Sequence, residues 1–273
     1  MRVLAATESG DPDRPNEDHI EIGADIAIVI DGATSRTETG CIHGVSWYAA
    51  QLGSAVQNRQ YAEDSLTSTL ARAIEDVADL HGNTCDLDHP GTPSAAITIL
   101  RRADTSIQWL VIGDVTLTLE TDSGLNVVTD DHAHIAAQEQ AEADRYPIGD
   151  RRKSEAMLRM KKAELAQRNV PGGFWVATSD PAVVDHALTG ELPTEELRRA
   201  LLMSDGAARL ADVFGLATHA ELLELVAWQG PQEALRRVRE TESKDPEGRQ
   251  WPRNKRSDDA TAVLCDFRRK ESD

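Results

Sequence analysis

Aspartates recur at the boundaries of short apolar segments in this sequence. Three of them follow such a segment and one precedes a segment: Asp31, Asp114, Asp205 and Asp258. An apolar strand is held rigidly by its sheet, so a carboxylate at its end is fixed in space while it still reaches solvent. If these strands end at the same rim of the fold, we expect the four carboxylates to form a cluster.

A cluster of carboxylates points to a divalent metal ion. Like charges a few ångströms apart cannot all stay ionised unless a cation neutralises them. Oxygen ligands suit Mg²⁺ or Mn²⁺, whereas zinc prefers histidine or cysteine. Gly32 and Gly206, which follow two of the acids, allow the backbone to turn tightly against a metal. A single Asp–Gly pair is more typical of a hairpin turn or a helix N-cap, but its repetition and the acid pair Glu17 and Asp18 favour a metal site.

Composition restricts the class of protein. The chain has 273 residues, 40% of them hydrophobic, and a net charge of −18. This length supports a substantial core, and we expect a single domain over residues 1–273. The negative charge disfavours binding to nucleic acid or to an anionic membrane, since both would repel it. The N-terminus lacks the apolar stretch of a secretory signal, and no apolar run has the length of a membrane span, so we expect a cytoplasmic protein.

The cysteines predict neither a disulfide framework nor a zinc site. Cys41, Cys85 and Cys265 are odd in number and lack the Cys-x-x-Cys spacing of zinc knuckles. A reducing compartment fits this pattern best.

Strand-like and helical patterns occur in blocks along the chain. Apolar, β-branched segments predict strands at 3–7, 19–22, 25–30, 95–100, 107–112, 115–119, 125–128, 174–178, 200–203 and 260–266. Helical spacing of apolar residues predicts helices at 42–57, 62–80, 218–228 and 231–242. The run from 95 to 128 predicts an antiparallel meander, because parallel strands would need crossover helices. This order predicts an α+β sandwich of antiparallel sheets with helices packed outside.

A polar segment interrupts this pattern at about 135–170. The stretches 131–142 and 153–167 are rich in Ala, Glu, Lys and Arg and have helical propensity but weak apolar faces. We interpret this segment as a helical insertion on the surface.

Seven short motifs follow one another along the chain: NED at 16–18, DG at 31–32, GT from 91, GD at 113–114, TDDH at 129–132, SDG at 204–206 and DDAT at 258–261. Their order resembles that of the metal-dependent serine/threonine protein phosphatases of type 2C, the PPM family, in a divergent, bacterial-like form. The resemblance covers nearly the whole chain. It implies an α-β-β-α sandwich of two antiparallel sheets flanked by helix pairs, with the insertion at about 135–170 acting as a flap beside the metal cleft.

The resemblance also implies a ligand set and a reaction. Asp31 would bridge two Mn²⁺ or Mg²⁺ ions, Glu17 and the carbonyl of Gly32 would complete one site, and Asp205 and Asp258 the other. Asp114 would hold a third, looser ion and Asp18 would orient waters. Two metal ions about 3.5–4 Å apart activate a water for in-line attack on phosphorus. The implied partner is a phosphorylated protein that is hydrolysed at phosphoserine or phosphothreonine.

Several residues depart from the family's pattern. Asp259 stands where the family has asparagine, which leaves open whether Asp258 or Asp259 binds metal. The substrate arginine lies four residues before the glutamate in the family, whereas Arg14 lies three before Glu17. Arg36 is an alternative phosphate contact, since a guanidinium binds phosphate oxygens in pairs, or else a solvated loop arginine.

Other polar residues allow more than one interpretation. The basic residues near Asp258 either attract a phosphorylated substrate or, as we favour, offset local acidity: Arg249, Arg253, Lys255 and Arg256. His132 and His134 have a spacing that permits metal ligation, but helix capping by Asp131 explains their segment better. His19 and His43 would polarise a leaving group only if they face the cleft.

Three classes of function remain open from the sequence. The first is a Mn²⁺- or Mg²⁺-dependent protein phosphatase, a phosphoric monoester hydrolase. The second is a catalytically weak or inactive regulatory protein with the phosphatase fold. The third is a hydrolase of small phosphate esters. The retained acids Glu17, Asp31, Asp205 and Asp258 favour an enzyme, because a scaffold without metal gains nothing from carboxylates that repel one another.

Overall fold

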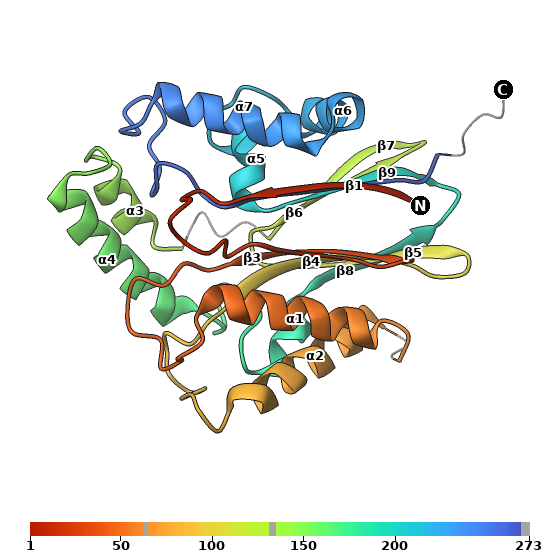
Figure 1. Cartoon of the computed structure of the whole chain (residues 1–273), viewed down its shortest axis with the longest axis horizontal. Coiled ribbons are helices and arrows are strands. Elements are labelled where there is room, and N and C mark those ends of the chain that lie inside the picture. Colours follow the sequence, from red (N-terminus) through yellow and green to blue (C-terminus); the bar gives the residue numbers. More distant parts are fainter. Residues whose placement is uncertain (63–64, 131–134, 269–273) are drawn as a thin grey trace.

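The protein is a four-layer sandwich in which two sheets pack face to face and helices cover both outer faces (Figure 1). The computed structural model describes residues 1–62, 65–130 and 135–268. One outer layer contains α1 (Val45–Arg59) and α2 (Leu66–His81), and the other contains α5 (Asp205–Asp212), α6 (His219–Gln229) and α7 (Pro231–Lys244). The predicted α-β-β-α sandwich of antiparallel sheets flanked by helices is confirmed.

Each sheet has five strands and every pairing is antiparallel. The first sheet has the order β1 (Arg2–Glu8), β10 (Ala260–Asp266), β9 (Leu197–Met203), β6 (Thr116–Thr121) and β7 (Gly124–Val128). The second has the order β2 (His19–Ile22), β3 (Ile26–Gly32), β4 (Ala95–Arg102), β5 (Ser106–Ile112) and β8 (Leu188–Pro193). The chain termini therefore meet in the first sheet, where β1 pairs with β10.

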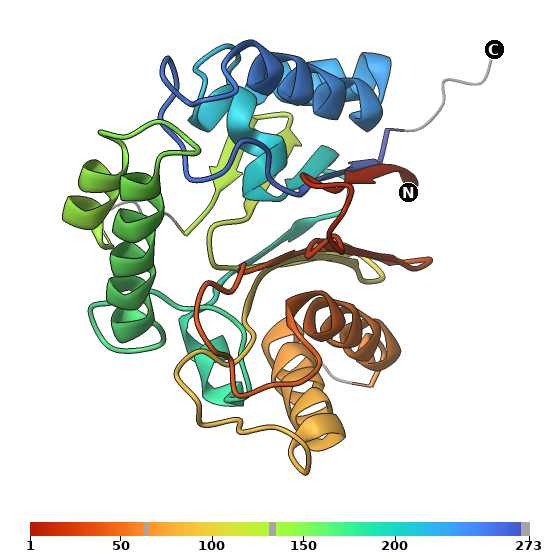
Figure 2. The same ribbon diagram turned by 60° about the vertical axis from the view of Figure 1, so that its left-hand side comes forward.

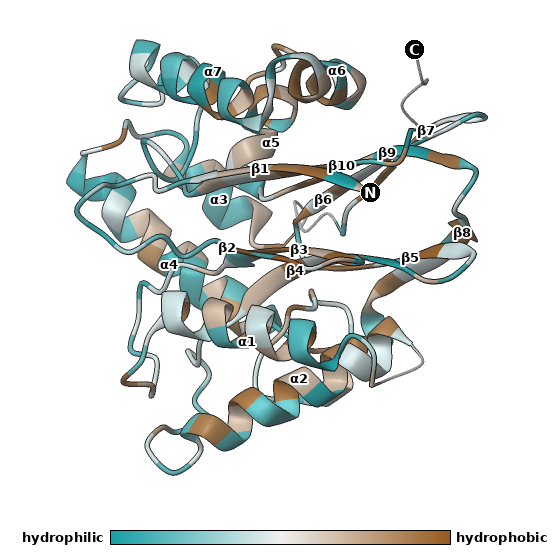
Figure 3. Ribbon diagram, turned by 45° about the vertical axis from the view of Figure 1, so that its right-hand side comes forward, coloured by the Kyte–Doolittle hydropathy of each residue, from teal (hydrophilic) through white to brown (hydrophobic). Residues whose placement is uncertain are grey.

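Strand β3 is apolar from Ile26 to Ile30, where both of its faces are buried. Successive side chains of a strand point to opposite faces, so Ile26, Ile28 and Ile30 pack against α1 and α2. Ala27 and Val29 pack into the layer between the two sheets. Figure 3 shows the apolar residues concentrated on the strands. The burial on both faces holds the strand rigidly up to the aspartate near its end.

The helical periodicity of α2 predicts its buried face. Leu66, Leu70, Ile74 and Val77 all lie in the core that α1 and α2 share with the second sheet. Ser65 caps the helix by accepting a hydrogen bond from the backbone N–H of Ser68.

The predicted meander over 95–128 is wrong in one respect, because its strands belong to two sheets. Strands β4 and β5 pair in the second sheet, whereas β6 and β7 pair in the first. The chain crosses between them at Gly113, whose φ of +84° few other residues adopt. An added Cβ there would lie 2.5 Å from Cβ of Ala96. The crossing places Asp114 in the short connection between the end of β5 and the start of β6.

Two strands also differ from the prediction. The segment 174–178 forms no regular strand in the structure and is joined to the sheet only by an isolated bridge between Ala95 and Ala177. Strand β8 was not predicted because its sequence, LTGELP, contains the glycine and proline of a loop. Both residues are tolerated because β8 is the edge strand of its sheet.

Helices α3 (Ala137–Ala143) and α4 (Arg151–Gln167) lie apart from the outer helical layers, at one end of the sandwich (Figure 2). Their small buried face consists of Ala143, Ala156 and Met157. This pair corresponds to the polar segment that we interpreted as a flap. The 3₁₀ helix Pro181–His186 follows it and packs against α2.

Candidate active site

The four aspartates at segment boundaries line one cleft of about 540 Å³ at an end of the sandwich. Asp31 lies near the end of β3 and Asp114 between β5 and β6. Asp205 is the first residue of α5, two residues after β9, and Asp258 lies two residues before β10. The cleft continues to α4, where Met160, Lys161 and Glu164 line it. The two sheets thus bring together the acids that the sequence separates by up to 227 positions.

Asp18 lies beneath this group with its side chain almost fully buried. Its Oδ2 accepts a hydrogen bond of 2.7 Å from the hydroxyl of Ser204. Its Oδ1 is buried without a hydrogen-bond partner among the described residues. An unpaired buried carboxylate oxygen is costly, so this atom marks a position where a water or an ion belongs.

Glu17 lies on the neighbouring side, in a smaller pocket of about 230 Å³ that it shares with Asp258. Its carboxylate accepts a hydrogen bond from the hydroxyl of Thr34. Glu17 is therefore close to the cleft, with an oxygen still available.

Three of the acids have raised pKa values, because loss of solvation and nearby carboxylates both disfavour their ionised forms. Burial raises the pKa of Asp18 to about 8, and the charges of Asp205 and Asp258 add to this effect. Burial in the cleft, followed by repulsion from Asp205, raises the pKa of Asp31 well above its usual range. Loss of solvation in the cleft and repulsion from Asp258 raise the pKa of Asp205 to about 7. Each carboxylate is held where its ionisation costs free energy unless a cation binds.

Asp258 differs because two cations hold it. Lys255 Nζ lies 2.5 Å from Oδ1 and Arg209 Nη2 lies 2.8 Å from Oδ2. Burial alone would raise its pKa, but the charges of Lys255 and Arg209 outweigh burial and lower the pKa. Lys255 also donates a hydrogen bond of 2.6 Å to Thr34, so its ammonium group connects Asp258 to the residue that binds Glu17.

The two adjacent aspartates before β10 have different environments. Asp258 lines the cleft with Asp31 and Asp205, whereas Asp259 does not line it. The carboxylate of Asp259 accepts backbone hydrogen bonds from Gly10 (2.8 Å) and Glu17 (2.6 Å). Asp259 thus fastens the loop that carries Glu17.

The glycines beside the acids are required for close packing. A Cβ added to Gly32 would lie 2.5 Å from the carbonyl oxygen of Glu17 and 2.5 Å from Val45. A Cβ added to Gly206 would lie 1.9 Å from the carbonyl oxygen of Asp259. Any larger residue would push the acid-bearing segments apart.

A basic pocket of about 370 Å³ adjoins the acid cleft. Arg14, Arg36 and Lys255 line it together with hydroxyl groups, and Ser154 and Leu158 of α4 form its other wall. Within the described ranges, the guanidinium groups of Arg14 and Arg36 take part in no hydrogen bond or ion pair, and both residues are exposed. Both predicted phosphate-contact arginines therefore lie in one pocket with free donors.

The remaining basic and histidine candidates that the structure describes do not line the acid cleft and have other contacts. Arg253 is buried with Asp245, and Arg249 pairs with Glu247, as expected for charges that offset local acidity. His19 contacts Glu21 on β2. His43 contacts the thiols of Cys41 and Cys85. It does not line the acid cleft but lines the smaller pocket that Glu17 shares with Asp258. The segment of His132 and His134 falls outside the described residues.

Sequence reasoning missed the structural role of three residues at the site. Lys255 was grouped with a basic cluster, yet it is one of the two cations that contact Asp258. Arg209 and Ser204 were not considered, although they bind Asp258 and Asp18. Of the three, only Ser204 could have been found from the sequence, because it belongs to the SDG motif.

Comparison with known proteins identifies the family. The sequence profile of the protein phosphatase 2C family matches residues 11–240. The chain belongs to the protein phosphatase 2C family. This match spans every acid of the cleft except Asp258, which follows it.

Solved structures of protein phosphatases share the fold of this protein phosphatase 2C member. The phosphatase MsPP from Mycobacterium smegmatis, solved with cacodylate, has 19% identity and a TM-score of 0.57, with 97% of this chain and 98% of that chain covered. PstP from Mycobacterium tuberculosis has 17% identity and a TM-score of 0.56 (98% and 99% covered). Stp1 from Staphylococcus aureus has 13% identity and a TM-score of 0.56 (98% and 95% covered).

Two other findings complete the comparison. A search of curated protein sequences found no match to this chain. Among the described residues, no helix combines the length and apolar character needed to cross a membrane.

Proposed function

We propose that this protein is a Mn²⁺- or Mg²⁺-dependent phosphatase that hydrolyses phosphoserine and phosphothreonine in proteins. The observation that carries this proposal is the group of acids with raised pKa values around Asp31. The orphaned Oδ1 of Asp18 and the all-oxygen donor set fit a hard divalent ion. A structure of the catalytic domain of PstP, 17% identical with a TM-score of 0.56, contains two manganese ions.

The acids divide into two sets of donors around Asp31. Glu17, Asp31 and the Gly32 carbonyl would hold one ion, and Asp31, Asp205 and Asp258 would hold the other. Asp114 with Asp205 would hold a third, looser ion. Asp259 is excluded from this set because backbone N–H groups already occupy its carboxylate. When bound, a pair of such ions lowers the pKa of water and neutralises phosphoryl oxygens.

The chain's own residues would orient the reactants. Ser204 fixes the carboxylate of Asp18 through Oδ2, which leaves Oδ1 to accept a hydrogen bond from a water in the cleft. Arg14 and Arg36, whose donors are free, would bind the phosphoryl oxygens of the substrate. Their pocket adjoins the acid cleft, as a phosphate held beside a nucleophilic water requires.

The shape of the cleft supports a protein substrate. Apolar side chains line the cleft beyond the acids, among them Met160, Leu165 and Phe174. The first two belong to the flap helix α4, so the flap contributes a surface against which a peptide chain can lie beside its phosphorylated residue. A small phosphate ester would leave this apolar wall unused.

The test is phosphate release across a Mn²⁺ titration, from an aryl phosphate and from a phosphothreonine peptide. We expect metal-dependent turnover in the wild type, higher activity on the peptide, and loss of activity in Asp31→Asn. Asp104→Asn is the matched control, because Asp104 is exposed in the turn between β4 and β5 and lies outside the cleft. Equal loss in both variants, or activity that ignores Mn²⁺, contradicts the proposal.

The contacts of Lys255 favour a second candidate, a regulatory protein with little or no turnover. Its ammonium group pairs with Asp258, one of the acids that would hold the second ion. A lysine that stays there would compete with the metal. Mn²⁺ binding without phosphate release from either substrate, in the wild type and in Lys255→Met, would support this candidate over the enzyme.

A further inference from the structure

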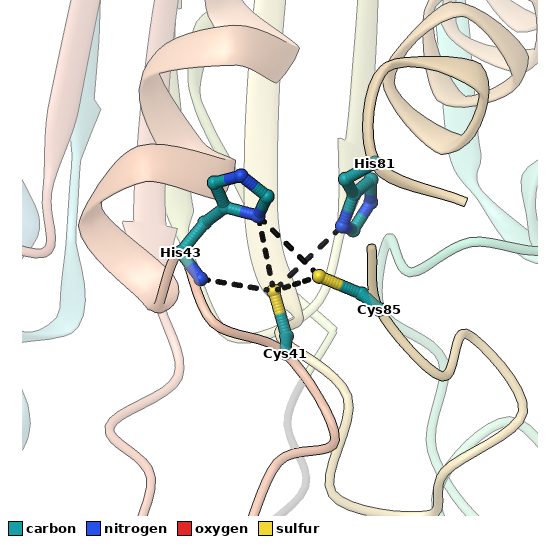
Figure 4. A group of neighbouring side chains, drawn as sticks. All are labelled: Cys41, His43, His81 and Cys85. Atoms are coloured by element: carbon teal, nitrogen blue, oxygen red, sulfur yellow. Dashed lines mark hydrogen bonds between the residues drawn. The ribbon is translucent and has the colours of Figure 1, made fainter. Parts of the chain in front are cut away.

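Two cysteines and two histidines converge where α1 begins and α2 ends (Figure 4). Cys41 and His43 lie just before α1, His81 is the last residue of α2, and Cys85 lies in the turn that follows. One ligand atom from each residue lies within 4.8 Å of the other three. In the part of the chain that the structure describes, no other group of cysteines, histidines and acids converges this closely.

The distances agree with the edges of a tetrahedron around one metal ion. Zn–S bonds of about 2.3 Å and Zn–N bonds of about 2.0–2.1 Å require S···S separations of about 3.8 Å and S···N separations of about 3.6 Å. The two sulfurs lie 3.4 Å apart. Cys41 Sγ lies 3.8 Å from His43 Nδ1 and 3.7 Å from His81 Nδ1, and Cys85 Sγ lies 3.4 Å from His43 Nδ1. Each separation is within about 0.4 Å of the expected edge.

We propose that Cys41, His43, His81 and Cys85 bind a zinc ion. Two thiolates and two imidazoles form a donor set that zinc prefers over Mg²⁺ or Mn²⁺, so this site and the all-oxygen cleft select different metals. Because the protein supplies four ligands, no position stays open for water or substrate. The site is therefore structural and not catalytic.

The groups around the four ligands hold them in orientation. The backbone N–H of His43 points to Cys41 Sγ at 3.4 Å, and the hydroxyl of Thr84 lies 3.6 Å from Cys85 Sγ. The indole of Trp47 stacks on the His43 ring, with 4.2 Å between the ring centroids, and packs near His81. Such outer contacts fix ring orientation and limit access of water.

The zinc site would anchor the loop that runs from the acid cleft. Residues 33–44 connect β3 to α1, and Thr34, Ser35 and Arg36 of this loop line the basic pocket. Gly40 near its far end accepts a hydrogen bond from the backbone N–H of Asp86, which follows Cys85. A zinc ion would thus join this loop to the end of α2, so we expect its loss to loosen the loop as well as the α1–α2 pair.

The sequence provided no indication of this group because zinc ligands were sought by Cys-x-x-Cys spacing. The ligands are instead Cys-x-His and His-x-x-x-Cys, separated by 37 residues that form most of the two helices. Only the antiparallel packing of α1 on α2 brings the two halves together.

The experiment is metal analysis of the full-length protein purified without chelators. We expect one zinc ion per chain in the wild type, a large loss of zinc in Cys85→Ala, and none lost in the matched control Cys265→Ala, which lies in the core between the sheets. Replacement by Co²⁺ should produce thiolate charge-transfer absorption and the intense visible bands of tetrahedral cobalt. The cobalt titration of the wild type remains informative if Cys85→Ala fails to fold.

Two results would overturn the proposal. One is a wild-type protein that neither contains zinc nor gives tetrahedral cobalt bands. The other is a Cys41–Cys85 disulfide in the peptide map of the freshly purified protein, which would indicate a redox pair. Asp31→Asn separates this site from the proposed phosphatase centre, because it should lose turnover and keep its zinc.

Discussion

The buried guanidinium group of Arg209 connects the acid cleft to α7, and its removal should destabilise the fold strongly. It donates hydrogen bonds of 2.7 Å to Glu242 and 2.8 Å to Asp258. The Arg209 side chain is 6% exposed and that of Glu242 only 1%. Arg209→Met preserves bulk but leaves a buried carboxylate without its main partner. Breaking a buried pair in this way costs about 3–5 kcal/mol.

The contacts in the structure favour the lower end of this range of destabilisation. Arg239 also donates to Glu242, at 3.0 Å, and Lys255 still holds Asp258. Since both acids keep one cation, we expect the free energy of unfolding to fall by about 3 kcal/mol. For a domain of this size, that corresponds to a fall in Tm of roughly 6–12 °C.

Urea unfolding in metal-free buffer measures this loss. The matched control is Arg237→Met, because Arg237 is 45% exposed and its ion pair with Glu233 should contribute less than about 1 kcal/mol. The double variant Arg209→Met/Glu242→Gln should recover at least half of the loss, since it removes the uncompensated charge. A loss below about 1 kcal/mol in Arg209→Met, or no recovery in the double variant, would refute the reasoning.

Three further predictions concern the acid cleft. Asp258→Asn should lower Mn²⁺-dependent turnover by more than the roughly 10–100-fold typical of outer-shell residues, whereas Asp259→Asn should retain most of the turnover. Equal rates in the two variants would contradict the proposal that Asp258, and not Asp259, binds the metal. Gly206→Ala should lower the free energy of unfolding by about 1–3 kcal/mol through overpacking against Asp259, which a urea titration would detect. The pKa of Asp18 is about 8 in the folded protein against 3.8 ordinarily, so the folded state binds more protons between these values and metal-free stability should fall as pH rises from about 4 to 8. Asp18→Asn should remove that part of the slope, and an unchanged slope would argue against the shift.

The elements with a strong local pattern were predictable without the tertiary structure. β2 and β10 occur at their predicted bounds, and the helical spacing of α2 gave its buried face correctly. The failures have physical causes: β8 has loop-like residues tolerated at a sheet edge, and the meander divides because Gly113 turns the chain into the other sheet. A local pattern carries no information on which sheet a strand joins.

The candidate site was also predictable from the sequence only in part. Residue types and their order along the chain were enough to indicate Glu17, Asp31, Asp205 and Asp258 as candidate acids for a hard metal, because acids recur at the boundaries of apolar segments. The sequence could not distinguish Asp258 from Asp259, since that distinction depends on which carboxylate meets the backbone N–H groups of Gly10 and Glu17.

What the sequence by itself determined is the chemistry of the donors, the family and the layers of the fold, because residue type and periodicity are local properties. Only the tertiary structure decided which charges meet. It set Lys255 and Arg209 against Asp258 and brought two cysteines close to two histidines across a helix pair. It also left Asp18 with an oxygen that has no hydrogen-bond partner in the described part of the chain. Electrostatic and coordination interactions act over a few ångströms, so residues that are distant in the sequence take part in them only after the sheets and helices have packed.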